Sequence, residues 1–379
     1  MQTSTNLTPV ARRIPVAQDR VRNRPALKAG AALLAILACQ TPVAHAADGV
    51  ATGDTGKKRI AFSNSYAGNS FRQVMIKSWE QVVAKASKDK LIDADSPVVS
   101  ANNSVTEQAS QIQNMILQGY DAIVILAASD TALNGTVRQA CDAGITVVSF
   151  AGIVTEPCAY QVNYDWGSYG KQEVDYVAQR LNGKGNLLEI RGIAGDSTDK
   201  DISAGIHAAA ASHPDLKIVG SVYGQWTATI AQKEVAGIIP SLPQVDAVVD
   251  QGGDGYGAAK AFEASGRPMP IIVMGNRQDE LVWWKHQHET NGYETFSISA
   301  TPSISQVAFW VAQQILAGKQ VPKKVEVPLL RIDQKDVDAW LTATPEGGVA
   351  NPFYTQDLVA AMIDANAHGA PLPPIPAPK

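Results

Sequence analysis

Residues 98–150 decide the fold, and they read VVSANNSVTEQASQIQNMILQGYDAIVILAASDTALNGTVRQACDAGITVVSF. Three short apolar runs alternate here with two longer amphipathic stretches. Ser104-Val-Thr-Glu107 is a capping box, in which a hydroxyl and a carboxylate bond the free N–H groups at the start of a helix. Gly119 then supplies a left-handed helix stop. The alternation predicts βαβ units, and therefore a parallel sheet covered by helices on both faces.

The same alternation continues on both sides of this stretch. Strands are predicted at Arg59–Asn64, Val98–Ala101, Ala122–Ala127, Ile145–Phe150, Asn186–Arg191, Lys217–Val222, Asp246–Asp250 and Ile271–Met274. Helices are predicted over residues 69–88, 104–118, 130–143, 168–182, 199–212, 227–239, 255–265 and 278–290. The first four strands and the second four are offset by a nearly constant distance, which indicates a weak internal duplication. A chain of 379 residues also favours two domains.

We therefore expect two doubly wound, Rossmann-like α/β lobes, with Asn163–Ser168 crossing between them. Past Met274 the pattern continues, and those pieces would complete each sheet as the chain crosses between the lobes again. They are strands at Thr295–Ser299 and Lys324–Leu330 and a helix at Ser303–Leu316; a further short helix is predicted at Thr355–Ala367, in the last stretch of the chain.

The first 46 residues differ from the rest. A basic segment precedes an apolar run, Ala29–Ala38, and then the tripeptide Ala44-His45-Ala46; the basic residues are Arg12, Arg13, Arg20, Arg22, Arg24 and Lys28. That order predicts a signal peptide over residues 1–46, cleaved after Ala46, and hence a periplasmic protein. The apolar run is shorter than the roughly 20 residues that span a bilayer.

Three features of this segment stay open. Arg12-Arg13 is also compatible with a twin-arginine signal. Ile36–Cys39 loosely resembles a lipoprotein cleavage box, so lipid anchoring at Cys39 is the alternative to a freely periplasmic protein. The basic segment is long, which leaves the true start codon open.

Cleavage would leave 26 basic against 35 acidic residues, a net charge of −9. Nucleic-acid binding needs clusters of Lys and Arg, so this charge excludes that class of partner. Cys141 and Cys158 would enter an oxidising compartment, where we expect them to form a disulfide. The alternative is two unrelated thiols.

Motifs that would indicate chemistry are weak. Gly253–Ala258 fits a dinucleotide-binding pattern, but the acidic residue expected at the end of the next strand is missing. We interpret this loop as a close approach to a ligand, with Asp254 as an acceptor. His286 and His288 lie two apart on a helix and point to different sides, so they predict no metal site. No catalytic pair emerges, and the sequence predicts no enzyme and no cofactor.

Four segments, in order and correctly spaced, resemble the ribose-binding-protein-like type I periplasmic binding proteins, which serve ABC importers. They are Ile60–Arg72, Gln118–Leu126, Ala143–Phe150 and Glu189–Gly195. The resemblance implies two lobes joined by a three-segment hinge, with the ligand between them. The N-terminal lobe would comprise residues 57–163 plus 300–323, and the C-terminal lobe residues 164–299 plus 324–340. Residues 341–379 would be a C-terminal extension with a proline-rich end.

The resemblance also implies which side chains contact the ligand. Amide and guanidinium groups would bond hydroxyls, and an aromatic face would stack on the C–H surface of a sugar. The residues are Tyr66, Asn69, Phe71, Arg72, Lys200, Trp226, Gln251, Asp254, Asn276 and Arg277.

Three departures from the family pattern bear on the ligand. Ala151-Gly152 and Arg277 stand where the family usually has aspartates, and Ala300 where it often has glutamine. Arg72 and Arg277 could instead grip a carboxylate in a bidentate manner. This pattern favours a sugar acid or a polyol over an aldose of the ribose type.

The predicted function is the substrate-binding component of an ABC importer, a monomer that delivers a small sugar-like ligand to an inner-membrane permease. The alternative is the ligand-binding component of a chemotaxis or sensor-kinase system, and nothing in the sequence separates the two. A sugar-responsive repressor of related fold would need an N-terminal DNA-binding segment, where a signal peptide stands instead. An exported hydrolase would need a catalytic pair.

Overall fold

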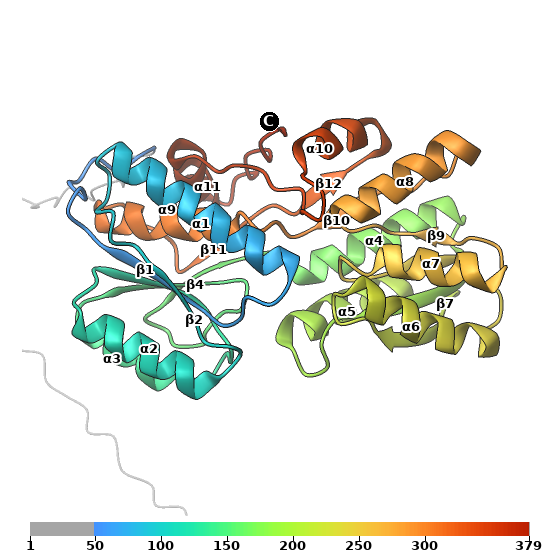
Figure 1. Cartoon of the computed structure of the whole chain (residues 1–379), viewed down its shortest axis with the longest axis horizontal. Coiled ribbons are helices and arrows are strands. Elements are labelled where there is room, and N and C mark those ends of the chain that lie inside the picture. The colour runs from blue at the N-terminus through green and yellow to red at the C-terminus, as the bar shows by residue number, and fades with distance from the viewer. Residues whose placement is uncertain (1–48, 379) are drawn as a thin grey trace, which may run out of the picture. The chain divides into compact units, whose positions relative to one another are not determined.

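The computed structural model describes residues 49–378 (Figure 1), which form two α/β lobes, each built on a parallel sheet. The predicted signal peptide and the alternative lipid anchor at Cys39 lie outside the described residues. Within residues 49–378 no helix is both long and apolar enough to cross a membrane.

The first sheet has six parallel strands in the order β11-β5-β4-β3-β1-β2. The strands are β1 (Ile60–Asn64), β2 (Val98–Ser100), β3 (Ala122–Leu126), β4 (Thr146–Phe150), β5 (Tyr160–Asn163) and β11 (Lys324–Glu326). Figure 1 shows helices on both faces, namely α1 (Ser70–Lys88) and α9 (Ile304–Leu316) on one and α2 (Val105–Leu117) and α3 (Asn134–Asp142) on the other. Because both faces are covered, β1 and β3 are apolar and buried along most of their length.

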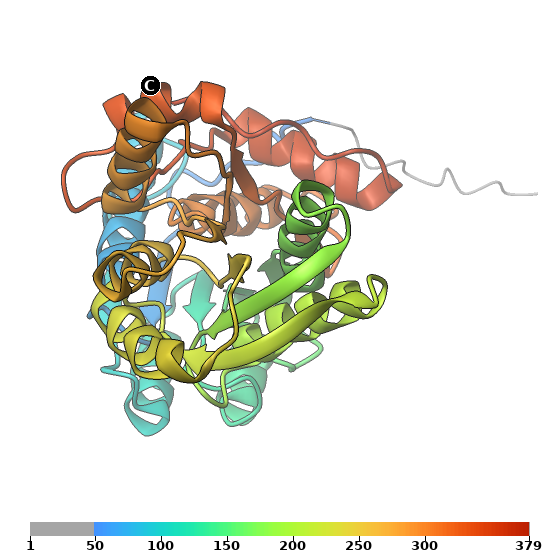
Figure 2. The ribbon, with the colours of Figure 1, turned by 90° about the vertical axis from the view of Figure 1, so that its right-hand side faces the viewer.

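The second sheet has the order β7-β6-β8-β9 and is also parallel. Its strands are β6 (Lys184–Arg191), β7 (Asp215–Tyr223), β8 (Ala247–Val249) and β9 (Ile271–Ile272). Figure 2 shows this lobe end-on, with helices on both sides of the sheet. They are α4 (Trp166–Arg180) and α5 (Ser197–Ala211) on one side and α6 (Ala228–Ile238), α7 (Gly255–Ser265) and α8 (Gln278–Asn291) on the other.

A short antiparallel pair, β10 (Ser297–Ser299) and β12 (Leu330–Ile332), lies beside the second sheet. The Met274 N–H donates to Phe296 O at 3.0 Å, which joins the pair to the end of β9. The remaining described elements are two 3₁₀ turns, at Ile239–Ser241 and Gln334–Asp336, and two helices, α10 (Val337–Ala343) and α11 (Gln356–His368).

Two predictions near the third crossing are wrong. Lys324–Leu330 is not one strand, because Pro328 lacks the N–H that a ladder requires and ends β11 before it. β11 pairs in parallel with β5 and belongs to the first sheet, whereas residues 324–340 were expected in the C-terminal lobe. The chain enters the second lobe only at β12. The remaining lobe boundaries stay predictions.

Three connections join the lobes, between β5 and α4, between β10 and α9, and between β11 and β12. The Tyr164 hydroxyl fastens two of them, since it accepts the Thr301 N–H at 2.9 Å and bonds Thr301 O at 3.2 Å. One hydrophobic cluster runs through this hinge, from Phe62 and Phe150 in the first lobe to Val249 in the second. The lobes therefore share buried apolar surface at the hinge.

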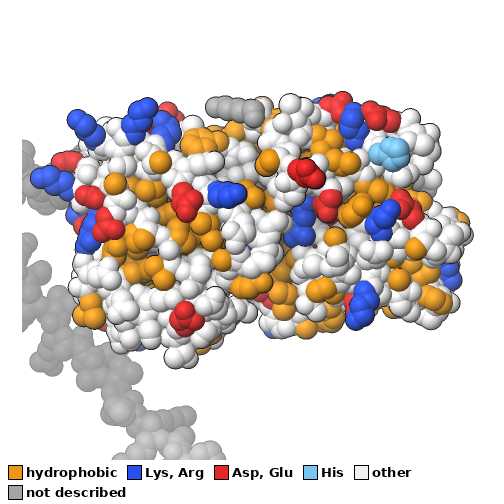
Figure 3. Space-filling model, viewed as in Figure 1, with side chains coloured by type: hydrophobic (Ala, Val, Ile, Leu, Met, Phe, Trp, Pro, Cys, Tyr) orange, Lys and Arg blue, Asp and Glu red, His pale blue; other side chains and the backbone are white. Residues whose placement is uncertain are grey.

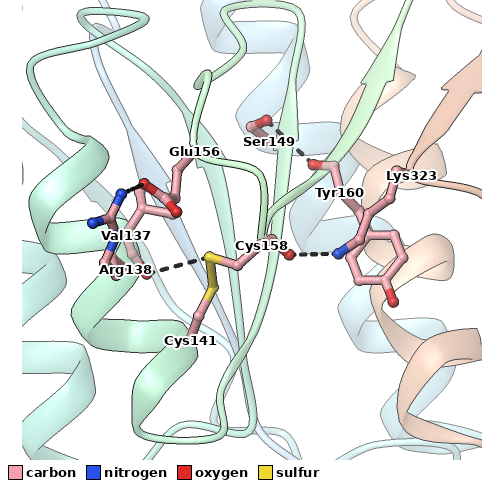
Figure 4. The surroundings of a disulfide bond; sticks show 8 residues. All are labelled: Val137, Arg138, Cys141, Ser149, Glu156, Cys158, Tyr160 and Lys323. Atoms are coloured by element: carbon pink, nitrogen blue, oxygen red, sulfur yellow. Dashed lines mark hydrogen bonds and ion pairs between the residues drawn. A yellow bond between two sulfur atoms is a disulfide. The ribbon is translucent and has the colours of Figure 1, made fainter. Parts of the chain in front are cut away.

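A disulfide links Cys141 at the end of α3 to Cys158 in the loop between β4 and β5 (Figure 4). The surrounding loop is held from both sides. Arg138 forms an ion pair with Glu156 at 2.8 Å, and Lys323 Nζ donates to Cys158 O at 2.6 Å. This covalent tie fixes the return of the chain from α3 to the edge of the sheet.

Candidate functional site

Ligands of open parallel α/β sheets bind outside the carboxyl ends of the strands. In the first lobe the loop after β1 forms this edge. Asn69 caps α1, because its Oδ1 accepts the Arg72 N–H at 2.9 Å. Phe71 and Arg72 follow in the first turn and are half-buried, whereas Tyr66 is 42% exposed. Four residues predicted to contact the ligand therefore lie together on one wall, and the side-chain oxygen of Asn69 is already used as a cap.

The first turn of α1 lies near the start of α5 in the second lobe. The positive charge of Arg72 and the negative charge of Asp196 interact. Burial lowers the pKa of Arg72 to about 10, while Asp196 opposes that shift, so the guanidinium stays charged at neutral pH. Lys200 is on the exposed side of the same helix start. Arg72 of the first lobe and Asp196 of the second therefore form a pair of opposite charges.

The second wall is built on a strained turn after β7. Gln225 and Trp226 both adopt left-handed conformations, with φ of 56° and 53°. A Cβ on Gly192 would lie 2.4 Å from the Trp226 indole, so the ring lies close against the backbone of residue 192, where a glycine is required. Non-glycine residues in this conformation cost roughly 1–3 kcal/mol each and cluster at ligand clamps.

Gln251 is buried and braces this wall from behind. Its Oε1 accepts the Gly192 N–H, and its Nε2 donates to the backbone oxygen and Oδ1 of Asp199, all at 3.0 Å. Asp199 is fully buried and also bonds Arg191 in a bidentate manner, at 3.1 and 2.6 Å. The sequence had given no sign of this burial. All three polar bonds of Gln251 are made inside the lobe, so it acts as a brace.

Asp254 and Arg277 hold the same turn. Asp254 Oδ1 accepts the Thr227 N–H at 2.7 Å. Arg277 donates from Nη2 to Trp226 O at 2.7 Å and from Nη1 to Gly253 O at 3.2 Å. Arg277 therefore spends part of its guanidinium on backbone carbonyls next to Trp226.

Asn276 lies at the hinge. Its Nδ2 donates to Ala300 O and to Ala350 O, both at 3.2 Å. The amide therefore joins the end of the second sheet to the β10–α9 connection and to the C-terminal extension.

Several buried oxygens at the carboxyl ends of the strands have no hydrogen-bond partner among the described residues. They are Asn64 Oδ1 and Asn163 Oδ1 in the first lobe and Asp250 Oδ2 and Asp254 Oδ2 in the second. An unpaired buried polar group costs about 1–3 kcal/mol, so each of these acceptors favours a donor that reaches it.

Besides Glu189 and Asp199, four further carboxylic acids are buried in the second lobe, namely Glu173, Asp250, Asp254 and Glu280. Burial raises the pKa of Asp254 to about 8, and raises the pKa values of Glu173 and Asp250 well above their usual range. Burial also raises the pKa of Glu280, although it accepts N–H groups from Gly255, Gly275 and Arg277. Protons are therefore held in this cluster at neutral pH.

The sequence analysis missed Asn64, Asp196, Asp250 and Glu280. Glu280 carries a partial signal, since it is the third residue of a helix, where a carboxylate can accept the backbone N–H of the residue before the helix, here Arg277. Asp250 directly follows a buried strand, which places it at the ligand edge of the sheet. Neither signal distinguishes a buried carboxylate from an exposed one.

A family model for the periplasmic binding protein domain matches residues 60–320. The chain belongs to the type I periplasmic binding proteins. This periplasmic binding protein is 35% identical to the xylitol-binding protein of Mycolicibacterium smegmatis over 186 residues, 48% of its own chain. It spans about half of that relative's length, 53%. It is 25% identical to the ribose import binding protein of Bacillus subtilis over 75% of its chain and 90% of the relative.

Solved structures show the same two-lobed fold. An ABC transporter solute binding protein from Thermobispora bispora is 35% identical, with a TM-score of 0.77 over 85% of this chain and 99% of that one. A solute binding protein from Actinobacillus succinogenes, solved with D-allose, has a TM-score of 0.63 at 21% identity over 74% of this chain and 99% of that one. The second likeness concerns the fold alone.

On the face of this periplasmic binding protein drawn in Figure 3, acidic and basic side chains are interspersed. Charges of one sign do not gather there into an extended patch.

Proposed function

We propose that this protein binds a polyol or neutral sugar between its lobes and delivers it to the permease of an ABC importer in the periplasm, without catalysis. The observation that carries the proposal is the set of buried side-chain oxygens without a hydrogen-bond partner near the strand ends of both lobes, at Asn64 and Asn163 in the first lobe and at Asp250 and Asp254 in the second. The amide oxygens of Asn64 and Asn163 accept hydrogen bonds, and a carboxyl that holds a proton both donates and accepts them. A polyhydroxylated molecule can satisfy both kinds of group, because each hydroxyl is a donor and an acceptor.

The ligand-contacting set that we propose consists of Tyr66, Asn69, Phe71, Arg72, Lys200, Trp226, Gln251, Asp254, Asn276 and Arg277, extended by the unpaired acceptors. Within it, Gln251 and Asn276 have the weaker claim to direct contact, because their donors already bond protein carbonyl or carboxylate oxygens. Trp226 supports a stacking surface.

The site favours a neutral ligand over a sugar acid. Arg277 already donates to two backbone carbonyls, so Arg72 is the remaining arginine for a carboxylate, and Asp196 competes for it. The printed names of two relatives, a xylitol-binding protein and a ribose import binding protein, agree with a neutral polyol or sugar.

Isothermal titration of the folded protein with xylitol, D-ribose, myo-inositol and D-ribonate tests this proposal. We expect saturable binding of at least one neutral compound, and weaker binding of D-ribonate. Arg72→Ala should weaken that binding, whereas Arg138→Ala, which changes a well-exposed arginine of the same lobe, should not. Binding of D-ribonate alone, or equal losses in both variants, would contradict the proposed site.

Signalling is the second candidate role. The fructose-binding periplasmic domain of a hybrid two-component system has the same fold, with a TM-score of 0.63 at 21% identity over 75% of this chain and 93% of that one. Ligand-dependent capture of a permease in detergent supports import, whereas ligand-dependent capture of a sensor-kinase ectodomain supports signalling.

A further inference from the structure

The chain beyond β12 returns to both lobes in turn. α10 packs against α8, and Trp340 is buried in the hydrophobic cluster of the second lobe. α11 packs against α9 and β11 of the first lobe, with Val359, Met362 and Ile363 buried. Figure 1 shows α10 and α11 over different lobes. The extension therefore crosses from the second lobe to the first, in addition to the three hinge connections.

The linker between these helices is hydrogen-bonded first to the second lobe. Gly348 O accepts the Gln278 N–H at 3.1 Å. The Ala350 N–H donates to Asn276 O at 2.8 Å, and the Asn276 side chain returns a bond to Ala350 O. These bonds form a short antiparallel pairing beside the end of β9.

The very next residue is bonded to the first lobe. Asn351 Oδ1 accepts the Ser303 N–H at the start of α9, and Asn351 Nδ2 donates to Ser78 Oγ on α1, both at 2.7 Å. The Tyr354 N–H then donates to Gln306 Oε1 at 2.9 Å. Two consecutive residues, Ala350 and Asn351, are thus hydrogen-bonded to different lobes.

The far end of the extension is fastened as well. Asn366 of α11 pairs with β11 through both backbone groups of Glu326, at 2.8 and 3.0 Å. The chain then turns at Gly369, whose φ of 62° ends the helix, and Ile375 packs against the hydrophobic cluster of the second lobe. The extension crosses between the lobes twice.

We infer that residues 337–378 act as a clasp that restricts the relative movement of the two lobes. Hinge motion in two-domain binding proteins is taken up by a few connecting residues. Here a rotation between the lobes about an axis that does not pass through these residues also displaces Asn276–Gln278 from Ser303 and Ser78, so it strains or breaks the bonds on either side of Asn351. The clasp narrows the range of lobe separations that the ligand-free protein samples.

Spin labels at Ser110 and Ala208, two exposed helix positions in different lobes, measure this range without ligand. Cys39 is replaced by serine, and the native disulfide leaves no other thiol free to react. Asn351→Ala removes the two hydrogen bonds that the Asn351 side chain makes to the first lobe. A chain that ends at Gly369 lacks Ile375 and so loses the contact of that residue with the hydrophobic cluster of the second lobe. Asn291→Ala is the matched control, because Asn291 is exposed on α8 and its side chain bonds only within Gln287–Tyr293.

We expect one narrow distance distribution for the unchanged protein and for Asn291→Ala. Asn351→Ala and the shortened chain should each widen it, and the two changes together should widen it further. Circular dichroism confirms that each variant is folded; should the shortened chain not fold, Asn351→Ala decides alone. Distributions in folded Asn351→Ala that match those of Asn291→Ala would overturn the inference. This inference rests on the two-lobed fold, so failure of every ligand titration leaves it standing.

Discussion

Removal of the disulfide is the perturbation whose magnitude follows most directly from the structure. Cys141 and Cys158 are 17 positions apart and close a loop that runs through β4. In the chain-entropy model, a cross-link over a loop of this length stabilises the folded state by about 3 kcal/mol at 25 °C, because it restricts the unfolded chain. Cys141→Ser combined with Cys158→Ser should therefore lower the free energy of unfolding by about 3 kcal/mol.

Urea unfolding followed by circular dichroism measures this loss, and the slope with urea should rise slightly, since the unfolded chain exposes more surface without the cross-link. Dithiothreitol should produce the same loss in the unchanged protein and no further loss in the double variant. A loss below about 1 kcal/mol under both treatments would refute the loop-entropy reasoning.

Three further outcomes follow from the second wall. Because burial raises the pKa of Asp254 to about 8, the folded state keeps a proton that the unfolded chain releases near pH 4, so the free energy of unfolding should fall as pH rises from about 4 to 8. Calorimetry should record that fall, and Asp254→Asn should reduce it and leave the part that comes from Glu173 and Asp250; a rise of the free energy of unfolding would contradict the prediction. Gly192→Ala places a Cβ 2.4 Å from the Trp226 ring, so it should destabilise by roughly 1–3 kcal/mol and shift tryptophan emission. Gln251→Leu removes the hydrogen bonds of Gln251 to Gly192 and Asp199, while the Gly192 N–H keeps its second bond to Asp199 Oδ1. At about 0.5–1.5 kcal/mol for each lost bond, the change should lower the melting temperature; an unchanged temperature would mean that Gln251 is no brace.

The sequence predicts the fold well where local signals and long-range structure agree. Half of the capping box at Ser104 forms as expected, with the hydroxyl accepting the Glu107 N–H at 3.2 Å, whereas the Ser104 N–H donates to Ala101 O instead of the Glu107 carboxylate. The short apolar runs become β1, β3 and β4 because their apolar residues need cover on both faces. β11 could not be assigned in the same way. A strand of three residues carries no periodicity, and the sheet that it joins depends on where the chain turns at Pro328.

For the candidate site too, the sequence predicts the features that depend on local signals and misses those that depend on long-range packing. The sequence predicts which loops end at the ligand edge, and Arg72, Trp226 and Asp254 are found on those loops. It does not predict which polar side chains bond the protein itself. Gln251 and Asp199 bond each other across 52 positions, and Asn276 bonds Ala350 across 74. Such pairings arise only once the lobes have packed, so the residues look alike in sequence whether they contact a ligand or brace a wall.

The bracing of the second wall links the clasp to the ligand edge. Left-handed Gln225 and Trp226 are unfavourable by roughly 1–3 kcal/mol each, and Arg277 opposes this strain with two charged hydrogen bonds, a class worth about 1.5–3 kcal/mol each. The Arg277 backbone in turn pairs with Val349 of the clasp. Val349 lies between Gly348 and Ala350, the two clasp residues whose backbone groups are hydrogen-bonded to the second lobe. One arginine is therefore held by the extension on its backbone and holds the tryptophan turn with its side chain. Because these contacts are continuous, movement of the clasp displaces the same residue that keeps Trp226 in its strained conformation.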